Sequence, residues 1–371
     1  MKPIFLFFAL ALASLVTLSA ARADEPPAHF HPGQIWNDTS GKPINAHGGG
    51  ILFHDGVYYW YGELKEGRTY LSRVNKSWGG TRVIAGGVSC YSSTNLYDWK
   101  NEGLALPSVA EDPDHDLACE NVIERPKVIY NAKAKKFVMW LHQDSPDYTA
   151  AHSGVAVSVS PTGPFKYIGS FRPNAGVWPV NVTAQDKPPG ENNYLARDFA
   201  GGQMSRDMTL FVDDDGTAYQ FYAAEDNGTL HVSQLTDDYL KPAGKYARIF
   251  IGRSTEAPAV FKRNGKYYLI ASGCSGWDPN TARSAVADNI FGPWTELGNP
   301  CRGANADKTF FCQSTFVLPV AGQTNRLIAM FDQWKKWNLQ DSRYVWLPVE
   351  FNNDGEPTVS WQEHWSLQTA K

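Results

Sequence analysis

The sequence of 371 residues is poor in charge and in cysteine. Only 19% of the residues are charged, compared with about 25% in an average soluble domain. A formal net charge of −4 and the lack of like-charge runs leave no basic footprint for nucleic acid or an anionic membrane. Five cysteines are too few for a disulfide scaffold in a chain of this length, although Cys301 and Cys312 could pair across a loop.

Several motifs of other enzyme classes are also missing. The sequence contains no C-x-x-C, HExxH, G-x-S-x-G, GxGxxG or Walker motif, so zinc proteases, serine hydrolases, dehydrogenases and NTPases have no support. Residues 213–216 look like the start of an EF-hand loop, but Ala224 stands where the loop needs Glu. We therefore interpret this segment as a hairpin turn. Separately, we expect no metal and no cofactor in the functional site.

The first 23 residues have the pattern of a secretory signal peptide. Lys2 gives a positive start, residues 4–18 are apolar, and small residues end at Ala21-Arg22-Ala23. The apolar run falls short of the roughly 20 residues that span a bilayer. We expect residues 1–23 to be removed, so that the mature chain begins at Asp24 in the periplasm or outside the cell.

Aromatic β-strands are what the sequence has in abundance. An apolar strand, a turn and an aromatic strand recur at residues 50–61, 127–141, 208–221, 258–270 and 315–331. Asp-Gly and Asn-Gly in these turns are strong hairpin signals. Further strand material and another aromatic follow each pair, which makes units of about four strands at a spacing of roughly 50–80 residues. We predict an all-β fold, a five-bladed β-propeller forming one domain over residues 24–371.

A polar residue precedes the innermost strand of every predicted blade. In chain order these residues are Asn45 and His47, Glu124, Asp207, Glu256 and Gln313. The pseudo-fivefold symmetry of a propeller brings equivalent positions together at the mouth of its channel, so we expect one funnel of convergent polar groups. Two carboxylates in a funnel suit hydrolysis of a glycosidic bond, because a nearby charge can keep one of them protonated as the acid.

At these residues the chain resembles glycoside hydrolase family 43, whose members are inverting enzymes built on five-bladed propellers. The resemblance is carried by Arg206-Asp207 with residues 211–216, and by residues 256–258 with residues 265–269. It extends over essentially the whole mature chain. It implies that Glu256 is the general acid and that Asp207 modulates the pKa of that acid.

A narrower resemblance is to the exo-β-1,3-galactanases (β-1,3-galactosidases) of that family, in residues 46–52, 59–63, 122–128 and 275–280. Most family members carry a catalytic-base Asp in the first blade, where this chain has Asn45-Ala46-His47. The galactanase-like group lacks that Asp and has a Gln in the last blade, which implies that Gln313 positions or activates the water. An amide is a far weaker base than a carboxylate. Either Gln313 acts as its imidic acid tautomer, or it orients the water while Glu124 takes the proton.

Five further side chains are candidates for contact with the sugar: Glu63, Glu124, Tyr148, Trp277 and His47. Carboxylates accept hydrogen bonds from sugar hydroxyls, and an indole ring can stack on a sugar face. Three of these candidates have a structural alternative. Glu124 could form a salt bridge with Arg125 or Lys127, and Trp277 could pack between blades. His47 could be a hydrogen-bonded core residue, or could hold a structural calcium ion in the channel, as the resemblance allows.

We therefore predict a secreted exo-β-1,3-galactosidase that acts as a monomer on plant-type arabinogalactan, with an oligosaccharide or polysaccharide as its partner and no nucleic acid or membrane. The same-class alternative is an α-L-arabinofuranosidase or β-xylosidase, which would need a first-blade base that the sequence does not show. The alternative from another class is a non-catalytic, sugar-binding propeller. The missing first-blade Asp favours it, while the pair of Glu256 and Asp207 argues against it.

Overall fold

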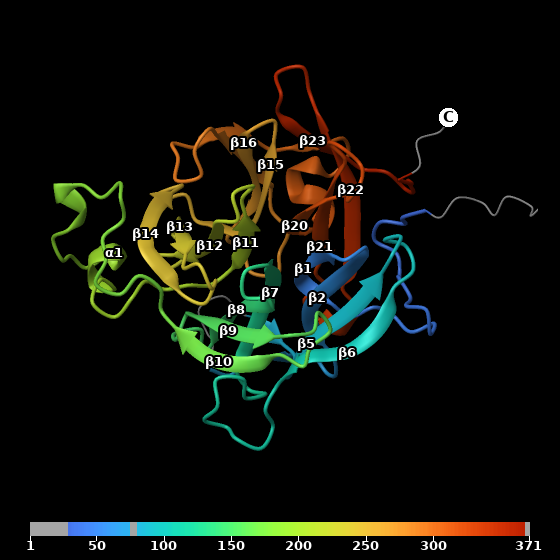
Figure 1. The fold of residues 1–371 in the computed structure, drawn as a ribbon, viewed down its shortest axis with the longest axis horizontal. Coiled ribbons are helices and arrows are strands. Elements are labelled where there is room, and N and C mark those ends of the chain that lie inside the picture. The colour runs from blue at the N-terminus through green and yellow to red at the C-terminus, as the bar shows by residue number, and fades with distance from the viewer. Residues whose placement is uncertain (1–28, 75–79, 368–371) are drawn as a thin grey trace, which may run out of the picture.

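Five β-sheets stand around a common axis in the computed structural model, which describes residues 29–74 and 80–367 (Figure 1). The first blade comprises β1 (His47–His54), β2 (Val57–Lys65), β5 (Ala85–Ser93) and β6 (Lys100–Pro107). The second comprises β7 (Val122–Asn131), β8 (Lys136–Asp144), β9 (His152–Ser158) and β10 (Lys166–Phe171). The third comprises β11 (Met208–Val212), β12 (Ala218–Ala224), β13 (Thr229–Leu235) and β14 (Pro242–Ile249).

The last two blades complete the ring. The fourth comprises β15 (Thr255–Arg263), β16 (Lys266–Gly273), β17 (Arg283–Ala287) and β18 (Thr295–Gly298). The fifth comprises β20 (Gln313–Pro319), β21 (Leu327–Gln333), β22 (Arg343–Phe351) and β23 (Pro357–Ser360), with β19 (Cys301–Arg302) added in parallel to β23. The first strands of successive blades contact one another around the axis, and β20 contacts β1. The prediction of a five-bladed β-propeller is confirmed.

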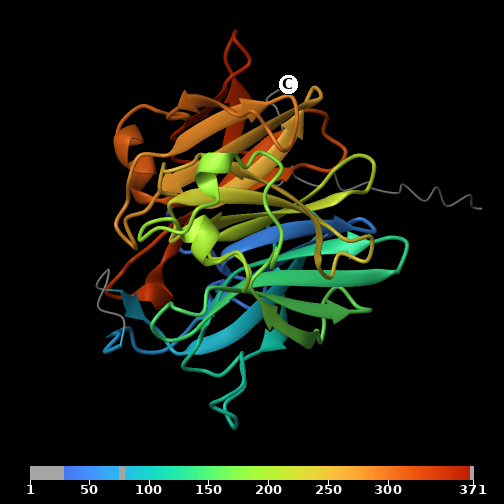
Figure 2. The ribbon, with the colours of Figure 1, turned by 90° about the vertical axis from the view of Figure 1, so that its left-hand side faces the viewer.

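The elements outside the blades are short. A two-stranded ribbon, β3 (Tyr70–Leu71) with β4 (Thr81–Arg82), is inserted in the first blade. The long connection between β10 and β11 carries η1 (Ala184–Asp186) and α1 (Tyr194–Arg197), and lies on the outside of the propeller (Figure 2). Two further 3₁₀ segments, η2 (Ala306–Phe311) and η3 (Leu339–Asp341), flank strands of the fifth blade. Within the described ranges, no helix has the length and apolar character needed to cross a bilayer.

The predicted hairpins correspond to the two inner strands of each blade, and residues 213–216 form the turn between β11 and β12. The aromatics that follow a turn, at 97–99, 163–165 and 292–294, lie directly before the outer strands β6, β10 and β18. Trp99 shows the reason: its indole is fully buried and donates to the Leu96 carbonyl at 3.1 Å, so the aromatic closes the turn and the strand starts afterwards.

The hydrophobic core lies between the blades. One cluster spans the fourth, fifth and first blades, and three others fill the spaces between the first and second, second and third, and third and fourth blades. Strand β8 is buried along nearly its whole length, because its sheet is covered on both faces, which explains its unbroken apolar sequence. Cys301 and Cys312 are buried and free, so the suggested disulfide is not formed.

The two ends of the described chain meet at the closure of the ring. Phe30 and Trp365 form an antiparallel bridge with backbone hydrogen bonds of 2.8 and 3.2 Å, and their rings stack at 4.4 Å between centroids. Both side chains are buried. The expected signal peptide, residues 1–23, lies outside the described residues.

Substituting Phe30 tests this closure. We expect Phe30→Ala to lower the free energy of unfolding by about 3–5 kcal/mol, because it leaves a cavity against Trp365 and removes a full aromatic ring from the core. Chemical denaturation followed by tryptophan fluorescence measures the loss. Phe53→Ala, at a partly exposed ring, should cost much less. Equal losses in the two variants would contradict a role for Phe30 in closing the propeller.

Candidate active site

The starts of three inner strands share one backbone conformation. Gly48, Arg125 and Ala257 have φ of 59°, 54° and 52°, and a register shift follows in each of the strands β1, β7 and β15. Such a bulge changes the direction in which the neighbouring side chain points. A positive φ is uncommon for residues other than Gly and is typical of functional positions. In the second and fourth blades the residue before it is a carboxylate that faces the propeller axis.

These carboxylates contribute to a cavity of about 580 Å³ at one end of the axis. It brings together seven of the eight site residues predicted from the sequence, namely Glu63, Glu124, Tyr148, Asp207, Glu256, Trp277 and Gln313. They come from all five blades, as the symmetry argument predicted. Five further residues line the cavity and were not predicted from the sequence: Arg125, His142, Arg206, Asp226 and Trp334.

His47 is the predicted residue that does not line the cavity. Its ring is buried, with Nδ1 2.9 Å from Asp332 Oδ1, and stacks on Tyr344 at 4.8 Å. Asn45 also points elsewhere, since its amide bridges the backbone of Lys65. The first blade contributes Glu63, from the end of β2, in their place. His47 therefore has the environment of a core histidine, and we do not retain the predicted sugar contact for it.

Glu256 is the carboxyl group whose environment favours its neutral form most. Burial raises the pKa of Glu256 to about 8, and the negative charge of Asp207 contributes in the same direction. The positive charge of Arg125 opposes these two effects only in part. Asp207 is held in place by Oδ2, which accepts from Arg125 Nη2 at 2.9 Å and from the Ala257 backbone N–H at 3.1 Å.

Gln313 has all of its amide atoms hydrogen-bonded. Oε1 accepts from Arg125 Nη2 at 2.6 Å and from Trp334 Nε1 at 3.0 Å. Nε2 donates to Glu256 Oε1 at 3.0 Å and to Ser272 Oγ at 3.1 Å. Since a guanidinium and an indole can only donate, the atom that faces them must be the oxygen, and the orientation of the amide follows. The same two donors disfavour an imidic O–H at this position.

Glu124 is held as a carboxylate, in contrast to Glu256. Burial alone would raise its pKa, but Lys65 at 3.7 Å and His142 at 3.4 Å outweigh burial and keep the pKa of Glu124 well below its usual range. The Tyr148 hydroxyl donates to Glu124 Oε1 at 3.0 Å. The alternative salt bridge of Glu124 with Arg125 or Lys127 does not form, because the Arg125 side chain reaches Asp207.

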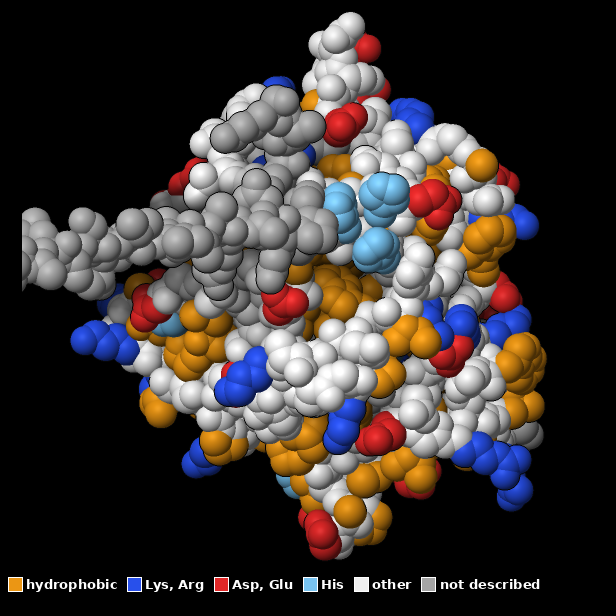
Figure 3. All heavy atoms as spheres, turned by 90° about the vertical axis from the view of Figure 1, so that its right-hand side faces the viewer, with side chains coloured by type: hydrophobic (Ala, Val, Ile, Leu, Met, Phe, Trp, Pro, Cys, Tyr) orange, Lys and Arg blue, Asp and Glu red, His pale blue; other side chains and the backbone are white. Residues whose placement is uncertain are grey.

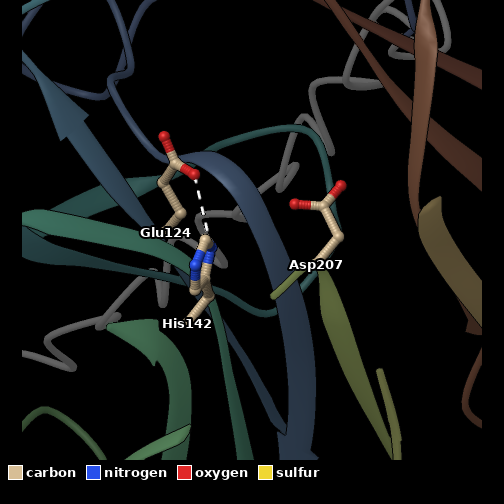
Figure 4. A group of neighbouring side chains, drawn as sticks. All are labelled: Glu124, His142 and Asp207. Carbon is tan, nitrogen blue, oxygen red and sulfur yellow. Dashed lines mark ion pairs between the residues drawn. The ribbon is translucent and has the colours of Figure 1, made fainter. Parts of the chain in front are cut away.

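Glu124, His142 and Asp207 offer ligand atoms within 4.8 Å of one another, a spacing that could hold a metal ion (Figure 4). Their other contacts do not fit this role. Burial would lower the pKa of His142, but Asp144 and Glu124 raise it to about 9, so a metal ion would have to displace a proton from the imidazole. Arg125 and Lys65 already neutralise the two carboxylates. The arrangement is that of an internal ion-pair network.

Next to the cavity, buried ionisable side chains fill the centre of the propeller, and burial lowers the pKa of Lys127 to about 7. The Nζ of Lys127 donates to the carbonyls of Gly48 at 2.8 Å and Arg125 at 3.4 Å. Glu63 accepts from the Arg125 backbone N–H at 2.9 Å and pairs with Lys65 at 2.7 Å. Glu63, Arg125 and Lys127 are all at most 5% exposed. Glu63 and Arg125 also line the cavity, so this buried layer forms part of its wall.

Two indole rings form one wall of the cavity. Trp277 and Trp334 meet edge to face at 4.8 Å, and Lys65 Nζ lies 5.3 Å from the centre of the Trp277 ring. Trp277 Nε1 donates to the Thr81 carbonyl at 2.8 Å. Trp334 could have been found from the sequence, since it follows the aromatic strand of the fifth blade as Glu63 ends that of the first. Arg125 had a weaker signal, a charged residue beside Glu124 at the start of an apolar strand.

Comparisons with known proteins agree with this architecture. The family model for glycosyl hydrolases family 43 matches residues 51–303. A solved family 43 β-1,3-galactosidase, determined with galactodeoxynojirimycin, is 48% identical over 91% of this chain and 100% of its own, with a TM-score of 0.83. The exo-β-1,3-galactanase of Phanerochaete chrysosporium, determined with β-1,3-galactotriose, is 34% identical over 92% of this chain and 68% of its own (TM-score 0.75). That of Clostridium thermocellum is 37% identical over 91% and 66% (TM-score 0.74). No curated protein sequence matches the chain.

The raised pKa of Glu256 can be measured directly. In carboxyl ¹³C NMR titrations we expect Glu256 to titrate near pH 8 and to titrate at lower pH in Asp207→Asn. The substitution removes a neighbouring negative charge and leaves the positive charge of Arg125 less compensated, and both changes favour the ionised acid. Asp226→Asn, a half-exposed carboxylate on the same cavity, should shift Glu256 little. An ordinary pKa near 4.5 in the wild-type protein would contradict this account of the site.

Proposed function

Because the chain belongs to glycosyl hydrolases family 43 and is an inverting glycosidase, we propose that it removes galactose from the ends of β-1,3-linked galactan chains. The observation that carries the proposal is the cavity in which Glu256, with its raised pKa, lies near the charge of Asp207. Similarity to exo-β-1,3-galactanases favours action at the chain end. Similarity to β-1,3-galactosidases over about nine tenths of the chain favours galactose as the sugar.

Glu256 is proposed as the general acid. Its pKa of about 8 leaves the carboxyl largely protonated at neutral pH, so that it can donate to the oxygen of the departing sugar. Asp207 is proposed to keep that pKa high through its charge. A binding protein would gain nothing from a protonated carboxyl of this kind, so its presence favours catalysis over a lectin-like role.

The water side of the reaction involves Gln313 and Glu124. An inverting pair needs room for water and sugar, with about 6.5–9.5 Å between the two groups, whereas Gln313 Nε2 lies 3.0 Å from Glu256. The Gln313 oxygen already accepts two hydrogen bonds. We therefore propose that Gln313 orients the water and that Glu124, an ionised carboxylate on the same cavity, accepts its proton. Glu63, Tyr148 and Trp277 are proposed to contact the sugar.

The proposed location of the enzyme and the number of chains that it needs rest on its sequence and its cavity. The signal-peptide pattern of residues 1–23 supports an exported enzyme, which would meet plant-type arabinogalactan in the periplasm or outside the cell. One chain supplies every residue that lines the cavity, so a monomer is sufficient for the reaction.

The acid is tested by Glu256→Gln, which keeps the shape and removes the proton. With β-1,3-galactobiose we expect kcat to fall by about 10²–10⁴-fold with little change in KM. For an aryl β-galactoside with a good leaving group, kcat should fall much less, because departure of that leaving group needs little protonation. Galactose release is measured by chromatography, and Glu296→Gln, at an exposed carboxylate of β18, serves as the control.

Two outcomes would count against these assignments. Near wild-type hydrolysis by Glu256→Gln would mean that the acid is a different residue. A wild-type enzyme that is active only on arabinofuranosides or xylosides in a panel of aryl glycosides would exclude galactan as the substrate.

The proton acceptor is tested by comparing Glu124→Gln with Gln313→Ala. We expect both to lose at least 10²-fold in kcat, and only Glu124→Gln to regain activity with azide, because azide needs no base to attack the anomeric carbon. The product of that rescue should be α-galactosyl azide, identified by NMR. Azide rescue of Gln313→Ala alone would instead assign the proton to Gln313.

A further inference from the structure

Three histidines gather on the surface where the two ends of the described chain meet. His29, His31 and His364 are exposed. Their ring centroids are separated by 5.4 Å between His29 and His364, by 6.4 Å between His29 and His31, and by 6.4 Å between His31 and His364. Figure 3 shows histidine side chains close together on this face.

The strand pairing explains why the rings are neighbours. Phe30 and Trp365 exchange both backbone hydrogen bonds and point into the core, so the residues on either side of them point outward. The same antiparallel register sets His31 opposite His364 in a non-hydrogen-bonded pair, with ring centroids 6.4 Å apart. His29 follows on the same face, diagonal to His364. The arrangement is therefore a property of the backbone closure.

The separations are close to what a metal ion requires. Zn²⁺ binds imidazole nitrogen at about 2.0–2.1 Å with tetrahedral angles, which puts the centroids of two bound rings roughly 5.2 Å apart. The His29–His364 separation is within a few tenths of an ångström of this value, and the other two exceed it by about 1 Å. The ring nitrogens do not yet all lie within 4.8 Å of one another. Binding of one ion to all three rings therefore requires the exposed side chains to rotate.

The environment of the three rings also differs from that of the ion-pair network in the active site. His142 is buried between Asp144 and Glu124, whereas no hydrogen bond or ion pair involves the rings of His29, His31 and His364 among residues 29–74 and 80–367. Their nitrogens are therefore available to an ion. Imidazole is a ligand that suits Zn²⁺, Cu²⁺ and Ni²⁺.

We propose that His29, His31 and His364 form a surface site for one divalent transition-metal ion, with water in the remaining coordination position. Two ligands come from the start of the described chain and one from its end, so the bound ion cross-links the two segments that close the propeller. An ion bound only by the folded chain stabilises that state. The site is separate from the proposed glycosidase function and does not depend on it.

The test uses the untagged protein, treated with a chelator and then titrated with ZnCl₂ in a calorimeter. We expect one Zn²⁺ per chain, and a rise in Tm on the order of 5 °C at zinc concentrations about 100 times the Kd. His31→Asn and His364→Asn should each weaken binding at least tenfold, and the triple variant with His29→Asn should abolish it. His54→Asn, outside the cluster, should bind zinc as the wild type does.

Two results would overturn the proposal. One is the absence of stoichiometric zinc binding to the untagged wild-type protein. The other is zinc binding that persists in the triple variant, which would place the ion elsewhere, for example at Glu124, His142 and Asp207. Galactosidase activity without zinc should be the same in all these variants, since none of the three histidines lines the cavity. This comparison separates a failure of the metal site from a failure of the proposed function.

Discussion

The buried guanidinium of Arg125 is the interaction on which the arrangement of the site depends. It belongs to the second blade and reaches Asp207 of the third blade and both Gln313 and the Ser314 carbonyl of the fifth, while its backbone N–H binds Glu63 of the first. A buried cation is tolerated only with partners of this kind, and removing one partner of such a pair costs about 3–5 kcal/mol. The groups proposed to do the chemistry are therefore also the groups that neutralise Arg125.

The propeller brings these groups together through the starts of its inner strands. Bulges follow Glu124 and Glu256, whose carboxylates face the axis. The next residues, Arg125 and Ala257, have a positive φ, a conformation that is unfavourable for residues other than glycine. The apolar remainder of each blade packs against its neighbours. Stability thus comes from the sides of the blades, while the axis is left for polar residues.

The surroundings favour the neutral form of one carboxyl group on the cavity and the ionised form of another. Burial and the charge of Asp207 raise the pKa of Glu256, whereas Lys65 and His142 hold the pKa of Glu124 low. This separation suits a reaction that needs a proton on one side of a bond and a carboxylate on the other. It arises from partners in different blades.

The sequence by itself determined the number of blades, the hairpins at their centre and the four polar residues that open the inner strands of the second to fifth blades, because strand alternation, turn residues and repetition are local patterns. Only the tertiary structure decided that Glu63 rather than His47 lines the cavity from the first blade, and that Arg125 pairs with Asp207 rather than Glu124. It also decided that both the amide oxygen and the amide nitrogen of Gln313 are hydrogen-bonded. It also decided that His29 and His31 meet His364. These contacts join residues from different blades or from opposite ends of the chain, and their distances are set when the ring closes, since no local pattern encodes which side chains then face one another.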